Sequence, residues 1–117
     1  MNKVAVIGAG AWGTALAIQA ARAGNQVLLW ARDPVAAAAM QQSRMAHRLP
    51  DHRLPDAIRV VSDMPAADLT LLVVPMQHMR AVLPRLPAES RNLVVCAKGV
   101  ETGTLRLPLE VLAELRP

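Results

Sequence analysis

A chain of 117 residues, 53% of them apolar, is long enough to form one domain with a buried core. Its net charge of +4 comes from 13 basic and 9 acidic residues spread along the sequence, and without Phe or Tyr only two tryptophans remain for stacking on bases. These features argue against a nucleic-acid partner. They fit either an anionic, phosphorylated ligand or a generally solvated, arginine-rich surface.

Cysteine and histidine usage indicates neither a disulfide nor a metal site. Cys96 is the only cysteine, and in the apolar run 93–96 it is expected to be a small buried hydrophobe rather than a nucleophile. The three histidines lack metal-ligand spacing. No apolar stretch approaches membrane-spanning length, and the N-terminus has no signal-peptide core, so we expect a cytoplasmic protein without a membrane partner.

The first motif is a G-x-G-x-x-G fingerprint that follows the apolar run 4–7 and opens a helix-forming run. Gly8 permits a sharp turn, Gly10 allows the backbone to approach a diphosphate, and Gly13 allows close packing of the helix on the strand. The loop N–H groups would lie at the positive end of the helix dipole. The motif therefore predicts a dinucleotide site formed by Gly8, Gly10, Ala11, Trp12 and Gly13.

The next elements continue a strand-helix-strand pattern. We expect a helix over residues 12–23, because Gly24-Asn25 is a helix stop, and a strand over 27–30 that is covered on both faces. Asp33-Pro34 has the form of an N-cap followed by proline in the first turn, so a second helix is predicted from there to about residue 45. Two Leu-Pro steps exclude regular helix from 47–55.

The second half of the chain predicts three more strands, at 58–61, 69–74 and 92–97, and a short helix over 77–83. In the tail, a helix is expected to start near Pro108 and to present Leu105, Leu109, Leu112 and Leu115 on one face. The alternation of strands and helices indicates an α/β fold with an open, doubly wound parallel sheet of Rossmann type. Ligands of such sheets bind beyond the carboxyl ends of the strands.

Four residues at these strand ends are candidates for binding. Arg32 and Asp33 follow the second strand, where an acid binds a ribose 2′-hydroxyl and an arginine suits a 2′-phosphate. We predict that Arg32 holds a 2′-phosphate or stacks on adenine, the alternative being a solvated loop residue, and that Asp33 mainly caps the helix beside a cofactor. Pro75 follows the fourth strand on the same edge. Lys98 follows the fifth and could polarise a carbonyl or bind a phosphate, or be a surface lysine.

Several motifs together resemble one family. The runs GAGAWGTALA at 8–17, RLP at 48–50, LP at 54–55, VP at 74–75 and AKGVE at 97–101, in this order and spacing, are similar to the bacterial NAD(P)-dependent glycerol-3-phosphate dehydrogenases. The resemblance implies an oxidoreductase that reversibly reduces dihydroxyacetone phosphate to sn-glycerol 3-phosphate with NAD(P)H, for phospholipid biosynthesis. It also implies that Lys98 binds both substrate and cofactor.

The resemblance also implies a missing part. The family's enzymes are much longer, with a helical C-terminal domain that holds most substrate contacts and a second essential lysine. Residues 1–117 would then be the NAD(P)-binding Rossmann domain of a two-domain chain, inactive alone and without a certain catalytic residue. This sequence departs from the family where it has Ala11 instead of Ser, Asp33 instead of His and Arg48 instead of Tyr, which puts particular cofactor hydrogen bonds in doubt.

Two other functions stay open. The chain could belong to another two-domain NAD(P)-dependent dehydrogenase that acts on a hydroxyacid or sugar phosphate, or it could be a non-catalytic dinucleotide-sensing module. The sequence does not choose between NADH and NADPH, and a homodimer is kept open as the assembly of the full-length enzyme.

Overall fold

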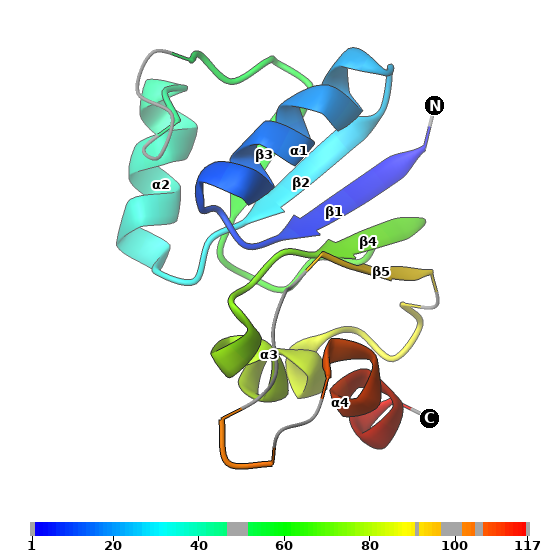
Figure 1. The fold of residues 1–117 in the computed structure, drawn as a ribbon. Coiled ribbons are helices and arrows are strands. Elements are labelled where there is room, and N and C mark those ends of the chain that lie inside the picture. The colour runs from blue at the N-terminus through cyan, green and yellow to red at the C-terminus, as the bar shows by residue number, and fades with distance from the viewer. Residues whose placement is uncertain (1, 47–51, 91, 97–101, 105–106, 117) are drawn as a thin grey trace.

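The computed structural model describes residues 2–46, 52–90, 92–96, 102–104 and 107–116. Its centre is one sheet of five parallel strands in the order β3-β2-β1-β4-β5 (Figure 1). The strands are β1 (Lys3–Ile7), β2 (Gln26–Trp30), β3 (Ile58–Val61), β4 (Leu69–Leu72) and β5 (Leu93–Val95). The strand order reverses at β1, so the predicted doubly wound sheet of Rossmann type is confirmed.

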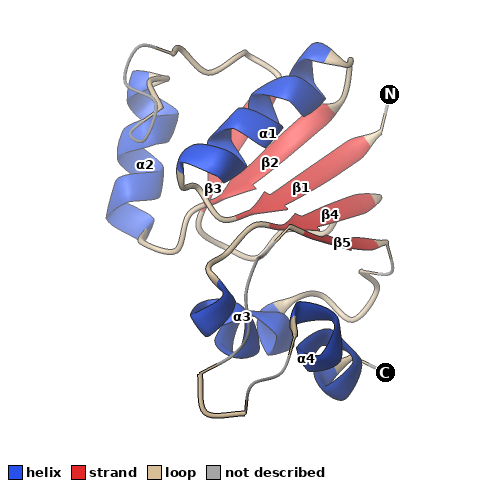
Figure 2. Cartoon of the chain, in the orientation of Figure 1, coloured by secondary structure: helices blue, strands red, loops and turns tan. Residues whose placement is uncertain are grey.

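Helices cover both faces of this sheet (Figure 2). On one face lie α1 (Ala11–Arg22) and α2 (Pro34–Ser43); on the other lie α3 (Met76–Val82), the 3₁₀ helix η1 (Leu83–Arg85) and α4 (Pro108–Leu115). Each of these helices and strands except η1 was predicted to within a few residues. The last two strands are shorter than predicted.

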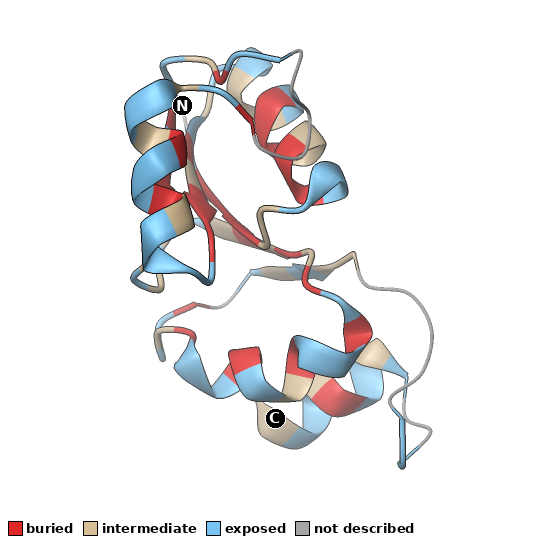
Figure 3. Cartoon of the chain, turned by 90° about the vertical axis from the view of Figure 1, so that its left-hand side faces the viewer, coloured by how far each residue is buried: buried red, intermediate tan, exposed pale blue. Residues whose placement is uncertain are grey.

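The alternation of side chains along β1 creates two separate cores. Val4 and Val6 face α1 and α2, whereas Ala5 and Ile7 face α3 and α4, and all four are at most 4% exposed. A strand that is covered on both faces needs a continuous apolar run rather than alternation with polar residues, and the run at 4–7 is of this kind. Buried residues accordingly line the inner sides of the helices as well as the strands (Figure 3).

Arg44 ends α2, and its side chain binds the segment that leads into β3. The residue adopts a left-handed backbone conformation with φ 61°. Its guanidinium donates to the carbonyl oxygens of Pro55 at 2.8 Å and Ile58 at 2.6 Å, and to Gln41 Oε1 at 2.9 Å. The same Gln41 oxygen accepts the Val60 N–H at 2.7 Å. The Gln41 side chain therefore both orients the Arg44 guanidinium and connects α2 to β3.

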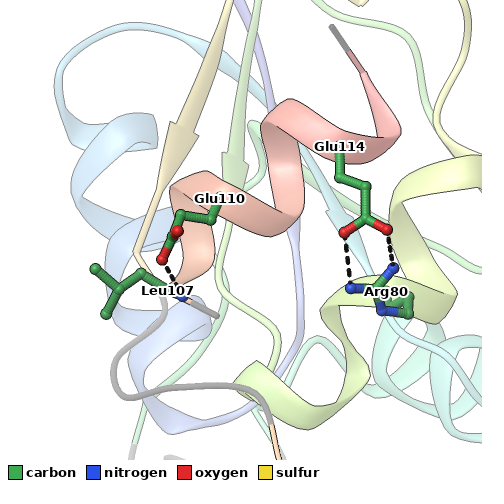
Figure 4. A network of polar contacts seen from close by, with 4 residues as sticks. All are labelled: Arg80, Leu107, Glu110 and Glu114. Carbon is green, nitrogen blue, oxygen red and sulfur yellow. Dashed lines mark hydrogen bonds and ion pairs between the residues drawn. The ribbon is translucent and has the colours of Figure 1, made fainter. Parts of the chain in front are cut away.

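The C-terminal helix α4 packs beside α3, to which one ion pair ties it (Figure 4). Arg80 of α3 makes a bidentate ion pair with Glu114 of α4, at 3.0 and 3.1 Å, and the Glu110 carboxylate accepts the N–H of Leu107 at the helix start. The predicted leucine face is only partly correct. Packing on α3 centres the inward face on the fully buried Val111 and leaves Leu109 66% exposed.

Two other predicted members of that face, Leu112 and Leu115, are half-buried against the core, and Leu105 lies outside the described residues. The sequence prediction placed the four leucines on one helix face from their spacing alone. Contact with α3 instead selects the positions around Val111, because a short helix buries only the side that meets its neighbour.

Candidate functional site

A pocket of about 520 Å³ lies where the carboxyl ends of three strands meet. The arrowheads of β1, β2 and β4 point to the edge of the sheet at which α1, α2 and α3 begin (Figure 1). Residues 8–13, 30–33 and 73–75 form most of the pocket wall, and Ala36, Met40, His78 and Val82 complete it. The structure thus brings together three of the four strand-end segments that the sequence singled out. The fourth, which contains Lys98, lies outside the described residues, as do Arg48, Leu49 and Pro50.

The three glycines of the loop meet different constraints. Gly8 has φ 126°, and a Cβ built there would come within 2.9 Å of the Val73 carbonyl group. A Cβ on Gly13 would overlap the backbone carbonyl oxygen of Gly8. A Cβ on Gly10 would meet no atom within 4 Å, so Gly10 leaves open space on the wall of the pocket. The turn therefore requires glycine at 8 and 13, whereas glycine at 10 keeps a ligand close to the backbone.

The start of α1 offers backbone donors to this pocket. The N-cap is Gly10, which provides no side-chain cap, and the first turn contains no acidic residue. The first backbone bond of the helix runs from the Thr14 N–H to the Gly10 carbonyl at 2.9 Å, so the N–H groups of residues 11–13 have no partner within the helix. Together with the positive end of the helix dipole they form a site suited to a phosphate group.

Two side chains of the first turn also line the pocket. Ala11 is exposed and small, and Trp12 is 60% exposed with its large apolar ring beside the loop. Buried Thr14, one turn further, donates from its hydroxyl to the Ala9 carbonyl at 3.3 Å and so fixes the loop from below. The Thr14 side chain of α1 thus holds the loop, while Gly10, Ala11 and Trp12 stay exposed.

Asp33 caps α2, as the sequence predicts. Its Oδ1 accepts the N–H of Val35 at 2.9 Å, and Pro34 occupies the first helical position. Asp33 also lines the pocket, next to the exposed Arg32. The α2 N-terminus is therefore closed by a carboxylate, in contrast to the start of α1.

We expect Asp33→Ala to lower the free energy of unfolding by about 1 kcal/mol, the usual loss for an N-cap. Denaturant unfolding followed by circular dichroism measures this. Asp33→Asn is the matched control, because an asparagine oxygen also accepts the Val35 N–H, and this variant should retain most of the stability. An alanine variant as stable as the parent chain would contradict the capping role.

Sequence reasoning missed the part of the site that α3 supplies. His78 and Val82 line the main pocket, and Arg85 joins them in a neighbouring pocket of about 350 Å³. A signal was present for two of them, since His78 and Val82 have the i, i+4 spacing of one face of a helix that follows a strand, whereas Arg85 lies beyond that helix in η1. The prediction used the histidines only to exclude a metal site.

Other candidate chemistries find little support in the described part of the chain. Cys96 is half-buried instead of fully buried, and burial raises the pKa of its thiol. Among residues 2–46, 52–90, 92–96, 102–104 and 107–116, no three His, Cys, Asp or Glu side chains gather as metal ligands. No described helix is long and apolar enough to cross a membrane.

Comparisons with known proteins agree on one family. The family model described as "NAD-dependent glycerol-3-phosphate dehydrogenase N-terminus" matches residues 3–117. The chain is 52% identical over 113 residues to a glycerol-3-phosphate dehydrogenase [NAD(P)+] of Acidiphilium cryptum, with 97% of this chain and 35% of the relative covered. A protein of the same name from Parvibaculum lavamentivorans is 48% identical, with 99% and 37% covered.

The fold of this chain also matches solved structures. A crystal structure of glycerol-3-phosphate dehydrogenase from Coxiella burnetii superposes with a TM-score of 0.84 at 32% identity, over 97% of this chain and 37% of that one. D-mandelate dehydrogenase in complex with NADH has a TM-score of 0.70 at 19% identity, over 98% and 35% of the two chains, which is a likeness of fold alone. The chain spans about a third of the length of the curated relatives it matches.

Proposed function

Since the chain belongs to the NAD-dependent glycerol-3-phosphate dehydrogenase N-terminus family, we propose that it is the dinucleotide-binding domain of an enzyme that reversibly reduces dihydroxyacetone phosphate to sn-glycerol 3-phosphate. The observation that carries this proposal is the uncapped start of α1 beside the open Gly10 on the wall of a 520 Å³ pocket. The relatives' extra length is the basis for proposing a second domain with most substrate contacts. Residues 1–117 alone would then bind NAD(P)H without turnover.

In this proposal the glycine loop binds the central pyrophosphate of the cofactor. The N–H groups of Ala11, Trp12 and Gly13 bind the pyrophosphate, and Gly8 and Gly10 let the backbone approach it. Arg32 and Asp33 are on the adenosine side, where Arg32 supplies charge and Asp33 fixes the segment through its cap. Pro75 closes the opposite wall. A bound NAD(P)H would supply the hydride, and NAD(P)+ would accept it in the reverse direction.

Lys98 is the proposed link to the substrate. In the sequence it comes three residues after β5, whose carboxyl end lies at the same edge of the sheet as that of β4 because the two strands are parallel. We assign it to substrate binding as well as to the nicotinamide side of the cofactor. The enzyme's proposed setting is the cytoplasm, where sn-glycerol 3-phosphate would enter phospholipid synthesis.

Calorimetric titration and a turnover assay test this function together. The 117-residue chain should bind NADH or NADPH without oxidising it, and the complete enzyme should oxidise it when dihydroxyacetone phosphate is present. Turnover of a 2-oxo acid instead would favour the alternative dehydrogenase. Cofactor binding without turnover of any such substrate by the complete enzyme would favour a dinucleotide sensor.

Arg32→Ala should weaken NADPH binding about ten- to a hundredfold and NADH binding less, because a charge-assisted contact to a 2′-phosphate is lost. Titration of both cofactors measures the ratio. Equal losses for both would make Arg32 an adenine-stacking residue, and no loss for either would make it a solvated loop residue.

A further inference from the structure

The smaller pocket next to the main site has an unusual set of polar side chains. Its volume is about 350 Å³, and its described lining consists of Arg32, Gln77, His78, Ala81, Val82 and Arg85. It shares Arg32, His78 and Val82 with the main pocket, so the two adjoin. A ligand can therefore place its pyrophosphate at the start of α1 and extend past Arg32. Its other end would then lie in the smaller pocket.

Arg85 is held in this pocket by an aromatic ring. Its guanidinium carbon lies 5.3 Å from the centroid of Trp30, within the range of a cation–π contact. Trp30 itself is fixed, being 1% exposed and donating from Nε1 to the Ser62 carbonyl at 2.9 Å. Stacking uses the face of a guanidinium and leaves its in-plane N–H donors available to a ligand. Arg85 is thus positioned before any ligand arrives.

The charges around the pocket favour an anion. Two guanidinium groups, from β2's end and from η1, line it together with the imidazole of His78, and none of the described lining residues is a carboxylate. The nearest acid along the chain, Asp33, lines only the main pocket and already accepts the Val35 N–H. A ribose 2′-hydroxyl offers no charge to two arginines, whereas a 2′-phosphate does.

We propose that Arg85 is a specificity-determining residue which, together with Arg32, binds the 2′-phosphate of the cofactor and makes this chain prefer NADPH to NADH. The proposal rests on the proposed function, because it assumes that a dinucleotide occupies the main pocket. It adds a residue from the α3–η1 segment to a subsite that the sequence assigned to Arg32 alone. The alternative role for Arg85 is structural, as a cover for the Trp30 ring.

The test compares two nucleotides that differ only in the phosphate at issue. Adenosine 2′,5′-bisphosphate and adenosine 5′-monophosphate are titrated calorimetrically into the full chain and into Arg85→Gln. We expect the parent chain to bind the bisphosphate about tenfold or more tightly than the monophosphate, and Arg85→Gln to lose most of that ratio. The variant's affinity for the monophosphate should stay within about twofold of the parent value. Retained monophosphate binding also shows that the variant is folded.

Two further variants sharpen the result. Arg22→Gln makes the same charge change in the last turn of α1, away from both pockets, and should leave the ratio intact. Arg85→Lys keeps the charge but loses the planar fork, so it should restore only part of the ratio. Equal weakening of both nucleotides in Arg85→Gln would overturn the proposal in favour of the structural role.

The outcomes separate this inference from the function on which it rests. If the parent chain binds both nucleotides with the same affinity, the NADPH preference is wrong while dinucleotide binding stands. If neither these nucleotides nor NADH and NADPH bind, the proposed function fails and the inference fails with it. A ratio that falls equally in Arg22→Gln would show a general charge effect and would likewise overturn the role of Arg85.

Discussion

Gly13→Ala should remove measurable dinucleotide binding and lower the free energy of unfolding by about 2 to 3 kcal/mol, the scale of a forced clash in a packed region. The new methyl group would overlap the Gly8 carbonyl oxygen, which belongs to backbone and cannot rotate away. Gly8 is itself confined by the Val73 carbonyl group, so α1 must move off the sheet. Denaturant unfolding and calorimetric titration with NADH measure the two effects.

Gly10→Ala is the matched control for this prediction. Its methyl group meets no protein atom within 4 Å, so unfolding should change by no more than about 0.5 kcal/mol. The methyl would stand on the pocket wall, however, and cofactor affinity should fall all the same. If Gly13→Ala bound NADH as the parent chain does, the close packing of the loop on α1 would not be required for the site.

Lys98→Ala in the complete enzyme should lower kcat/KM by about a hundredfold or more, the scale of losing one preorganised donor. In the proposed reduction of dihydroxyacetone phosphate, hydride would reach the carbonyl carbon while negative charge grows on its oxygen. A fixed ammonium group stabilises that charge more in the transition state than in the ground state. Steady-state kinetics, with cofactor affinity measured in the absence of substrate, separates the two proposed roles of this lysine.

Lys3→Ala serves as the control, since Lys3 is the other lysine and lies exposed at the amino end of β1, the edge of the sheet opposite the pocket. Its kcat/KM should match that of the parent enzyme. Lys98→Arg should restore little activity, because a planar guanidinium does not replace a compact ammonium at short range. A strong loss of cofactor affinity with kcat intact would make Lys98 a cofactor contact and leave the electrostatic role to the proposed second domain.

The features that the sequence predicted well depend on neighbours along the chain. The runs at 4–7 and 27–30 are continuous because both faces of a central strand are covered, and this follows from pattern alone. Asp33-Pro34 acts within one turn. The packing of Gly13 against Gly8 is also local, although Gly8 is further confined by Val73, which is distant in sequence. Local chemistry of this kind needs no knowledge of the tertiary structure.

The features it missed arise between distant segments. Cys96 and Val94 are more exposed than an apolar run suggests, because β5 is at the edge of the sheet and Val94 is left 44% exposed. The approach of Arg85 to Trp30 joins positions 55 residues apart in sequence. No spacing rule predicts such a contact, since it depends on how the chain folds to bring η1 near the Trp30 ring.

The placement of the two tryptophans gives this chain a built-in pair of spectroscopic reporters. With no Phe or Tyr, all of its intrinsic fluorescence comes from Trp12 and Trp30. Trp12 is 60% exposed beside the glycine loop, so we expect the emission of a hydrated indole that a ligand in the pocket would quench. Trp30 is 1% exposed, so we expect a blue-shifted emission that is lost when the sheet unfolds. Occupancy of the site and integrity of the fold can therefore be followed in one spectrum, at different wavelengths and without a label.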